Sequence, residues 1–354
     1  MRYRLLGNTG LLVSTLGLGT NMFGTGGLKA YGALGRKQAA AVIAEAFEGG
    51  LNFIDTADGY SGGESEEVVG QAISDLGVNR SNILICTKFS NRVGDGPNEI
   101  GGTRARIFNA LHTSLKRLQT EYIDVYTMHG YDPLTPLEET LRALDDAVNA
   151  GKVRYIACSN FTSWQMMKAI GISRQFRYAR FEAFEGLYSL GARDVERDIV
   201  PMLIDQRASL MVWGPLASGI LTGKYGRDGS GPPGSRLTFD EDSNLREDFV
   251  AGDVTRAFDA VDVLKPMAFD KGVTISQLSL AWLLHRPTVT TVLFGSRNGN
   301  QVRENLAAAD IDLTRQEMAR LDEVNALRTE YPAWKQRLFE KRRRASFGVP
   351  ASSK

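Results

Sequence analysis

The sequence predicts an α/β fold in which eight parallel strands and their helices close into a (β/α)8 TIM barrel. Two observations lead to this prediction. Short apolar runs typical of buried strands alternate eight times with stretches of helical periodicity. In addition, polar residues suited to proton transfer follow several of these runs, and parallel barrels place their chemistry at the C-terminal ends of strands.

The strand candidates are short runs rich in β-branched, aromatic and leucine residues. They lie at 15–20, 51–57, 82–89, 122–129, 153–160, 178–184, 208–214 and 289–295. Amphipathic segments between them include 37–50, 65–77, 102–118 and 135–152, and several close on Gly, as helices often do. This repeated strand and helix order favours a closed barrel over an open sheet.

Three segments fall outside the alternation. Asn8, Thr9 and Gly10 separate two short apolar runs, which predicts an N-terminal β-hairpin cap on the bottom of the barrel. The stretch at 222–253 is rich in Gly, Pro and Asp and predicts a mobile flap over the top face. From about Arg328 the tail predicts an extra C-terminal helix with a basic end. No linker divides the chain, so we expect residues 1–354 to form one domain.

Composition and charge exclude several kinds of partner. The 354 residues are 43% hydrophobic and 23% charged, and their formal net charge of +1 gives no basic field that would attract nucleic acid. No signal-peptide pattern and no apolar run of about 18 residues occurs, so we expect a cytoplasmic protein without a membrane partner. Cys86 and Cys158 have no Cys or His neighbour at metal or redox spacing, which predicts buried thiols and no bound metal.

Four residues suited to proton transfer share one placement. Asp55, Lys88 and His129 each come last on the inward face of a strand candidate, because successive strand residues point to opposite faces. Tyr60 follows five residues after Asp55 and can reach back from the next loop. Any one of them could be an ordinary polar residue at a strand end, but the shared placement favours a common site.

These side chains suit the reduction of a carbonyl group. The pKa of a free tyrosine is about 10, and a nearby Lys88 ammonium is expected to lower the pKa of Tyr60 by favouring the phenolate. Asp55 would hold Lys88 in its charged form, and neutral His129 would orient the carbonyl oxygen. Tyr60 would then protonate that oxygen as a hydride reaches the carbon. No amino-acid side chain supplies a hydride, so the site needs a cofactor.

The usual nucleotide-binding motifs are incomplete in this chain. Gly17 and Gly19 are followed by Met22 where the third glycine of GxGxxG belongs, and the sequence at 219–224 is one residue short of a P-loop. Two other loops, at 215–225 and 295–307, follow the seventh and eighth strand candidates. Barrels often build phosphate sites from these two loops, although each loop could also be a simple turn.

Several ordered segments together resemble the aldo-keto reductase superfamily. They are NFIDTADGYSGGESEEVVGQAI, CTKFS, SLKRLQTEYIDVYTMHGYDPLTPLEETLRALDDAVNAGKVRYIACSNF, VWGPLASGILTGKY and GSRNGNQVRENLAAA. The resemblance runs from about residue 3 to about residue 335 and is strongest to the microbial branches related to the potassium-channel β subunits. It implies a (β/α)8 barrel that binds NADP(H) across its top face.

The resemblance also implies a role for each site residue. Tyr60 is the general acid and base, Lys88 and Asp55 tune it, and His129 directs the carbonyl. The residues assigned to the cofactor are Gly19, Thr20 and Asn21 after the first strand; Ser159, Asn160 and Trp213 at the nicotinamide; Gly214, Leu216, Ser218, Gly219, Leu221, Gly223 and Lys224 along the pyrophosphate; Gly295, Ser296 and Arg297 at the adenosine 2′-phosphate; and Gln301, Glu304 and Asn305 near adenine. A contact between Arg and phosphate is charge-assisted, so NADPH is expected to be preferred over NADH.

Two positions depart from the family pattern. Glu182 takes the place of the usual Gln in the sixth strand candidate. It is expected either to contact the cofactor with one altered hydrogen bond or to pair with Arg180. Gly214 replaces the usual Ser after Trp213, which removes one hydroxyl contact to the cofactor.

We therefore expect an NADPH-dependent oxidoreductase that reduces an aldehyde or ketone to an alcohol, or catalyses the reverse reaction. Two alternatives stay open: a slow-turnover NADP(H)-binding regulatory subunit, and a lyase that forms a Schiff base through Lys88. The sequence identifies neither the carbonyl or alcohol substrate nor the oligomeric state.

Overall fold

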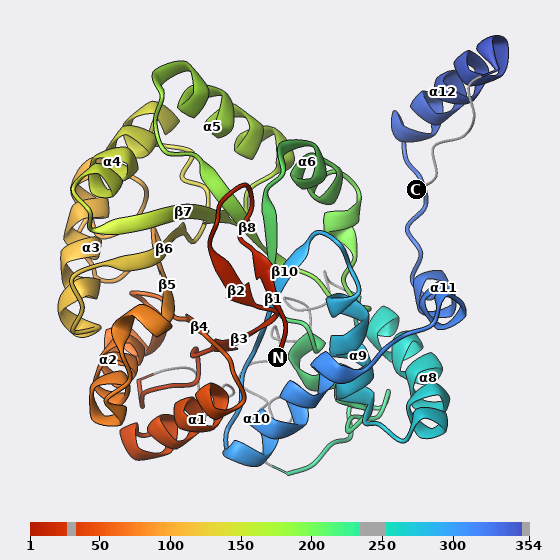
Figure 1. Cartoon of the computed structure of the whole chain (residues 1–354), viewed down its shortest axis with the longest axis horizontal. Helices are drawn as coiled ribbons and strands as arrows, with labels where there is room; N and C mark the ends of the chain where they lie inside the picture. Colours follow the sequence, from red (N-terminus) through yellow and green to blue (C-terminus); the bar gives the residue numbers. More distant parts are fainter. Residues whose placement is uncertain (27–32, 234, 236–252, 349–354) are drawn as a thin grey trace.

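The predicted barrel is confirmed by the computed structural model, which describes residues 1–26, 33–233, 235 and 253–348. Eight parallel strands close in the order β10-β3-β4-β5-β6-β7-β8-β9, with helices around them (Figure 1). The strands are β3 (Leu16–Gly19), β4 (Phe53–Asp55), β5 (Leu84–Phe89), β6 (Ile123–Met128), β7 (Val153–Ser159), β8 (Phe181–Leu187), β9 (Ser209–Trp213) and β10 (Val289–Phe294). The sixth predicted run, at 178–184, is displaced, because β8 begins at Phe181.

Most of the helices cover the outside of the barrel, and the last of them projects away from it (Figure 1). They are α1 (Arg36–Glu48), α2 (Glu64–Leu76), α3 (Arg104–Arg117), α4 (Leu137–Asn149), α5 (Ser163–Phe176), α6 (Ile199–Gln206), α8 (Val254–Lys271), α9 (Ile275–Leu284), α10 (Gly299–Leu306), α11 (Arg315–Glu323) and α12 (Ala333–Phe347). Local signals set several ends. Thr103 caps α3 by accepting a hydrogen bond from the backbone N–H of Arg106, and Gly77 ends α2 with a φ of 62°.

The N-terminal hairpin closes the bottom of the barrel, as predicted. β1 (Tyr3–Leu5) and β2 (Leu12–Ser14) pair antiparallel. Leu6 and Val13 are fully buried and share one apolar cluster with barrel residues. The barrel members of that cluster are Phe53, Leu84, Cys86, Val125, Ala157, Ala183, Met211 and Leu293. This cluster fills the lower interior, so a site can form at the C-terminal ends of the strands.

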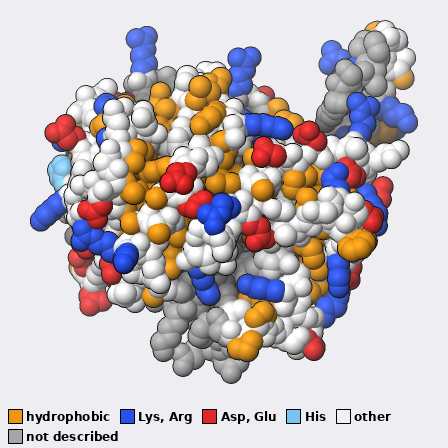
Figure 2. Space-filling model, turned by 60° about the horizontal axis from the view of Figure 1, so that its bottom comes forward, with side chains coloured by type: hydrophobic (Ala, Val, Ile, Leu, Met, Phe, Trp, Pro, Cys, Tyr) orange, Lys and Arg blue, Asp and Glu red, His pale blue; other side chains and the backbone are white. Residues whose placement is uncertain are grey.

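The predicted C-terminal helix is also present. α12 stands away from the barrel in Figure 1 and contains no buried residue. Lys and Arg side chains lie on this projecting helix in Figure 2. The predicted flap at 222–253 falls largely on residues 234 and 236–252, which lie outside the described residues.

Charged side chains of both signs are interspersed over the face shown in Figure 2, as the small net charge leads one to expect. Within the described ranges, none of the helices combines the length and the apolar character that crossing a bilayer requires.

Candidate active site

A large cavity opens at the C-terminal ends of the barrel strands. Its volume is about 1200 Å³. Its wall includes the last residues of β3, β4, β7, β9 and β10, which are Gly19, Asp55, Ser159, Trp213 and Phe294. Sites for small ligands usually measure about 300–1,000 Å³, so this cavity has room for a ligand as long as a dinucleotide together with a substrate.

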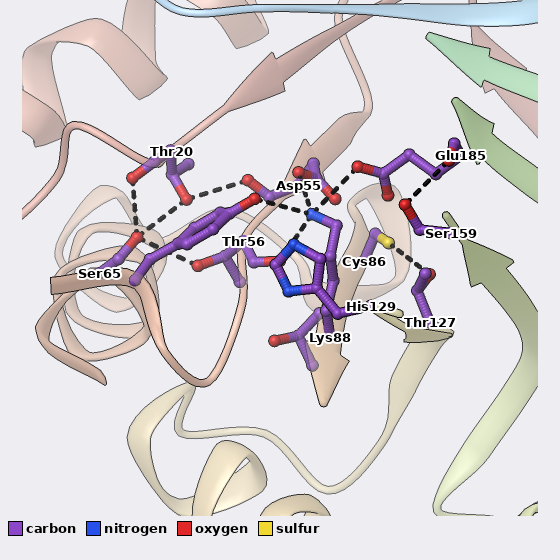
Figure 3. Close-up of polar contacts among 12 residues, drawn as sticks. Thr20, Asp55, Thr56, Ser65, Cys86, Lys88, Thr127, His129, Ser159 and Glu185 are labelled. Atoms are coloured by element: carbon purple, nitrogen blue, oxygen red, sulfur yellow. Dashed lines mark hydrogen bonds and ion pairs between the residues drawn. The ribbon is translucent and has the colours of Figure 1, made fainter. Parts of the chain in front are cut away.

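Lys88 lies behind this cavity wall, at the centre of the polar contacts that join its residues (Figure 3). Its side chain is fully buried, and its Nζ lies 2.5 Å from Asp55 Oδ2 and 3.3 Å from Tyr60 Oη. The ammonium also donates to the carbonyl oxygen of Thr56 at 3.1 Å. Asp55 and Lys88 come from adjacent parallel strands and both point inward, so the structure brings together these residues as the strand alternation predicted.

The turn after β4 directs Tyr60 back over the barrel. Tyr60 begins a short 3-10 turn in which Ser61, Gly62 and Gly63 all have positive φ, of 50°, 67° and 100°. At Gly63 an added Cβ would lie 2.1 Å from Cζ of Arg117, so the guanidinium of Arg117 would have to move. Glycine is therefore favoured at Gly63 chiefly by its positive φ.

The pKa of Tyr60 is raised above its ordinary value, in contrast to the lowered pKa expected from the sequence. Burial is the largest cause, and Lys88 lowers the pKa as expected, but the negative charges of Asp55 and Glu185 raise it further. Burial also disfavours the charged form of Lys88, yet the same two carboxylates raise the pKa of Lys88 well above its ordinary value. At neutral pH the site therefore holds a protonated phenol beside an ammonium ion.

Glu185 is the acidic residue that faces the cavity from β8, which corrects the prediction made for Glu182. Glu182 lies near the hairpin at the bottom of the barrel, where it pairs with Arg180 at 2.8 Å and accepts a hydrogen bond from the backbone N–H of Asn8. The pairing with Arg180 was the alternative foreseen for it. A register irregularity between β7 and β8, at Ile156, shifts the alternation of β8, so Glu185 points inward.

Glu185 joins the Lys88 cluster. Its Oε1 lies 3.3 Å from Lys88 Nζ, and the residue is 3% exposed at the cavity wall. Burial, reinforced by the charge of Asp55, raises the pKa of Glu185 to about 8, and Lys88 opposes this shift. One ammonium is thus shared by two buried carboxyl groups (Figure 3).

His129 lies beside Tyr60 in the cavity wall. Their ring centroids are 5.8 Å apart, with the planes nearly perpendicular at 78°. Burial, and then the charge of Lys88, lower the pKa of His129 to about 3, so the imidazole is neutral at physiological pH. Asn91 Nδ2 lies 3.1 Å from His129 Nδ1. With this amide donating to Nδ1, the neutral ring carries its proton on Nε2.

The cavity extends from the Lys88 cluster to the loops after β9 and β10, where Lys224 and Arg297 bring positive charge into its lining. Gly219 lines the same wall, has a φ of 95°, and has no side chain that would cover its backbone. Gly214 has a φ of 66°, which explains why glycine is favoured where serine was expected. Cationic side chains and glycine-rich backbone are suited to binding phosphate groups.

The structure places most of the residues assigned to the cofactor in the wall of one cavity. Those lining it are Gly19, Thr20, Asn21, Ser159, Asn160, Trp213, Gly214, Leu216, Ser218, Gly219, Lys224, Gly295, Arg297, Gln301, Glu304 and Asn305. Leu221, Gly223 and Ser296 are not in the lining; Leu221 and Ser296 are buried behind it. The hydroxyl of Thr20 is already hydrogen-bonded to the backbone oxygen of Asp55 and to Ser65 (Figure 3).

The residues present fit a dinucleotide on two grounds. First, the loops after β9 and β10 supply the positive charges of Lys224 and Arg297 and glycine backbone with positive φ. Second, a buried polar atom lies at the ends of the strands. That atom is Oε2 of Glu185, which has no hydrogen-bond partner among the described residues. A bound group with a hydrogen-bond donor or a positive charge would satisfy it.

Comparison with protein families agrees with the geometry. The model of the Aldo/keto reductase family matches residues 15–326, most of the chain. The chain belongs to the aldo/keto reductase family. The superfamily resemblance drawn from the motifs is therefore confirmed.

Relatives of this aldo/keto reductase match almost the whole chain. A "Probable voltage-gated potassium channel subunit beta" of Arabidopsis thaliana is 37% identical over 313 residues, which is 88% of this chain and 92% of the relative. A protein of the same name from Oryza sativa subsp. japonica is 36% identical with the same coverage. A "Putative voltage-gated potassium channel subunit beta" of Schizosaccharomyces pombe is 36% identical over 330 residues, or 91% and 92% of the two chains.

Sequence reasoning missed two residues of this aldo/keto reductase site. Glu185 was missed because the family's Gln position was assigned to Glu182 and the strand candidate ended at 184, whereas β8 runs from Phe181 to Leu187 and pairs irregularly with β7. Asn91 was missed because it lies in the loop after β5 and has no charge or motif of its own. Its position shortly after Lys88, at the top of a barrel strand, was the available signal.

Proposed function

We propose that this aldo/keto reductase is an NADP(H)-dependent oxidoreductase that interconverts an aldehyde or ketone and an alcohol. One observation carries the proposal: the phenolic oxygen of Tyr60 lies 3.3 Å from the Lys88 ammonium at the wall of a dinucleotide-sized cavity. A protonated phenol next to a fixed positive charge can give up its proton and leave a stabilised phenolate. That is the proton half of a carbonyl reduction.

NADPH would supply the hydride for this reaction when bound. Tyr60 Oη would donate its proton to the carbonyl oxygen while the carbonyl carbon gains the hydride, and Lys88 would stabilise the phenolate that remains. Asp55, at 2.5 Å, keeps Lys88 charged and in place. The Nε2–H of neutral His129 would donate to the same carbonyl oxygen and orient it. In alcohol oxidation each proton transfer runs in reverse.

The charges in the cavity support one orientation of the cofactor. Phosphate groups would bind near Lys224 and Arg297, so the ring that carries the hydride would lie at the Lys88 cluster, next to Tyr60. Preference for NADPH over NADH is proposed from Arg297. We expect Arg297→Ala to weaken NADPH binding by about tenfold or more, since a hydrogen bond to a charged group contributes about 1.5–3 kcal/mol. NADH affinity should change little; an equal loss for both cofactors would refute this role.

The direct test of the proposed function is Tyr60→Phe. The variant keeps the ring and removes the acidic proton, so we expect kcat for reduction to fall by about 10²-fold or more while NADPH affinity stays unchanged. A panel of aldehydes, ketones and sugars would be followed by NADPH absorbance in both directions. Turnover close to that of the wild type would show that Tyr60 is not the acid.

A second candidate function is that of a regulatory subunit that binds NADP(H) and converts its substrate only slowly. The relatives from the two plants and Schizosaccharomyces pombe are named as probable or putative potassium channel β subunits, which favours this candidate. Tight NADPH binding without turnover on any member of the carbonyl panel would support it. The other alternative, a Schiff-base lyase, is disfavoured because an amine must be neutral to attack a carbonyl, and the two carboxylates hold Lys88 as an ammonium ion.

A further inference from the structure

Two carboxyl groups of the cavity wall share one buried ammonium, and they do not share it equally. Lys88 Nζ is 2.5 Å from Asp55 Oδ2 but 3.3 Å from Glu185 Oε1. The ammonium of Lys88 therefore neutralises the carboxylate of Asp55 more completely than that of Glu185. Oε2 of Glu185 is buried without a hydrogen-bond partner among the described residues. When both carboxyl groups are ionised, the cluster carries a net negative charge that is centred on Glu185.

The strands next to β8 do not supply a second positive charge. In register with Glu185 are Ser159 on β7 and Met211 on β9, both uncharged. The titratable groups that act on Glu185 from β4 and β5 are Asp55 and Lys88. The cationic residues of the lining, Lys224 and Arg297, lie in the loops after β9 and β10. Glu185 is thus a buried carboxyl group whose charge is only partly neutralised by Lys88, beside a cavity that can admit a ligand.

We propose that Glu185 makes the site distinguish the oxidised from the reduced nicotinamide cofactor, by attracting the positive charge that the oxidised ring carries and the reduced ring lacks. This inference rests on the proposed function, because it requires that the nicotinamide lies at the Lys88 cluster. It also goes beyond that function, since it assigns the preference between NADP⁺ and NADPH to one residue and predicts how the preference depends on pH.

The pH dependence follows from the charge of Glu185. Its pKa of about 8 means that the carboxyl loses its proton between neutral and mildly alkaline pH. Ionised Glu185 attracts the oxidised ring, so the affinity for NADP⁺ relative to NADPH should rise with pH. By linkage, NADP⁺ binding must lower the pKa of Glu185 and release a proton, whereas NADPH binding should not. Because Asp55 and Glu185 share Lys88, the released proton belongs to the pair.

Burial also raises the pKa of Asp55, which titrates together with Glu185 as a pair. The other neighbouring groups do not change charge in the same pH range. The pKa values of Tyr60 and Cys86 are raised above their ordinary values by burial, and that of His129 is lowered to about 3. The pKa of Lys88 is also raised well above its ordinary value. The 2′-phosphate of the cofactor titrates near pH 6, but both cofactor forms carry it, so its effect cancels when their affinities are compared.

The experiment measures the Kd of NADP⁺ and of NADPH for the full-length chain by calorimetry at about pH 6 and about pH 9. In the wild type we expect the ratio of Kd for NADP⁺ to Kd for NADPH to fall by about tenfold or more over this range, since an opposite charge a few Å away shifts a pKa by about one unit or more. Glu185→Gln preserves the shape and removes the charge, and its ratio should change by less than about twofold. Glu182→Gln is the matched control on the same strand, outside the cavity, and should behave as the wild type.

A second measurement needs no variant. NADP⁺ binding at about pH 8, repeated in two buffers of different ionisation enthalpy, should show proton release that NADPH binding lacks. If both cofactors bind but the ratio is independent of pH, or Glu185→Gln retains the wild-type dependence, the inference is overturned and the proposed function stands. If the wild type binds neither cofactor, the proposed function is overturned and the inference falls with it.

Discussion

Replacing Lys88 with Met is expected to destabilise the protein strongly, and more so at alkaline than at acid pH. Methionine keeps the length of the side chain but removes the ammonium that Asp55 and Glu185 share in a fully buried position. Removing one partner of a buried ion pair typically costs about 3–5 kcal/mol. The variant can avoid an uncompensated charge by protonating Asp55.

The cost of that protonation gives the magnitude and the sign. Unfolded Asp has a pKa of about 3.9, and each pKa unit corresponds to about 1.36 kcal/mol. Holding Asp55 protonated therefore costs about 5.6 kcal/mol at pH 8 and about 1.5 kcal/mol at pH 5. The folded variant binds a proton that the unfolded chain has lost, so stability falls as pH rises above the unfolded pKa. We therefore expect a loss of about 3–5 kcal/mol at pH 8 that shrinks by more than half at pH 5.

Urea unfolding followed by circular dichroism at both pH values would measure this loss. The double variant Lys88→Met with Asp55→Asn is the matched control, because it removes the stranded carboxylate and should regain most of the stability at pH 8. A loss below about 1 kcal/mol at pH 8, or equal losses at the two pH values, would refute the view that Lys88 neutralises buried carboxylates.

Three further predictions test packing, titration and positioning. Gly70→Ala in α2 should destabilise the protein by about 1–3 kcal/mol, because the new Cβ would lie 2.6 Å from the backbone oxygen of Arg117. Gly171→Ala in α5 places its Cβ in open space and should stabilise the protein by up to about 1 kcal/mol. Equal thermal shifts for the two variants would argue against this packing. Burial lowers the pKa of His129 to about 3. As the pH falls from 7 to 5, the unfolded chain therefore gains a proton on His129 that the folded chain does not bind, and this difference should lower the stability by about 2 kcal/mol. His129→Gln should lack that part of the pH dependence in urea unfolding, and an unchanged dependence would contradict it. Asn91→Ala removes the donor to His129 Nδ1, and the loss of about 1.4 kcal/mol should lower kcat about tenfold. NADPH affinity should stay unchanged. An unchanged kcat would exclude a positioning role for Asn91.

The barrel and the Lys88 cluster were predictable because both depend on local periodicity. Alternation along 51–57 and 82–89 placed Asp55 and Lys88 on inward faces, and parallel strands of a barrel must bring such residues together at one end. The turn that returns Tyr60 to this cluster is likewise encoded locally, by the adjacent glycines at 62 and 63.

The position of Glu185 was not predictable from the same rule. A single irregularity in the pairing of β7 with β8 reverses which residues of β8 face the cavity, and no residue type marks it in the sequence. The raised pKa of Tyr60 was missed for a related reason. Its sign depends on the sum of burial and two negative charges, one of which comes from Glu185 on a strand far away in sequence.

The arrangement of charges separates two tasks within the described cluster. Lys88 lies between two carboxyl groups, so its pKa is raised and it stays charged through the physiological range, which suits it to stabilise a phenolate. Tyr60 stays protonated until a substrate oxygen accepts its proton, because burial opposes the free phenolate. The group whose charge can respond to neutral or mildly alkaline pH is then Glu185, which titrates as a pair with Asp55. Asp55, Lys88 and Tyr60 would therefore determine whether proton transfer occurs, and Glu185 would determine which redox state of the cofactor the site holds.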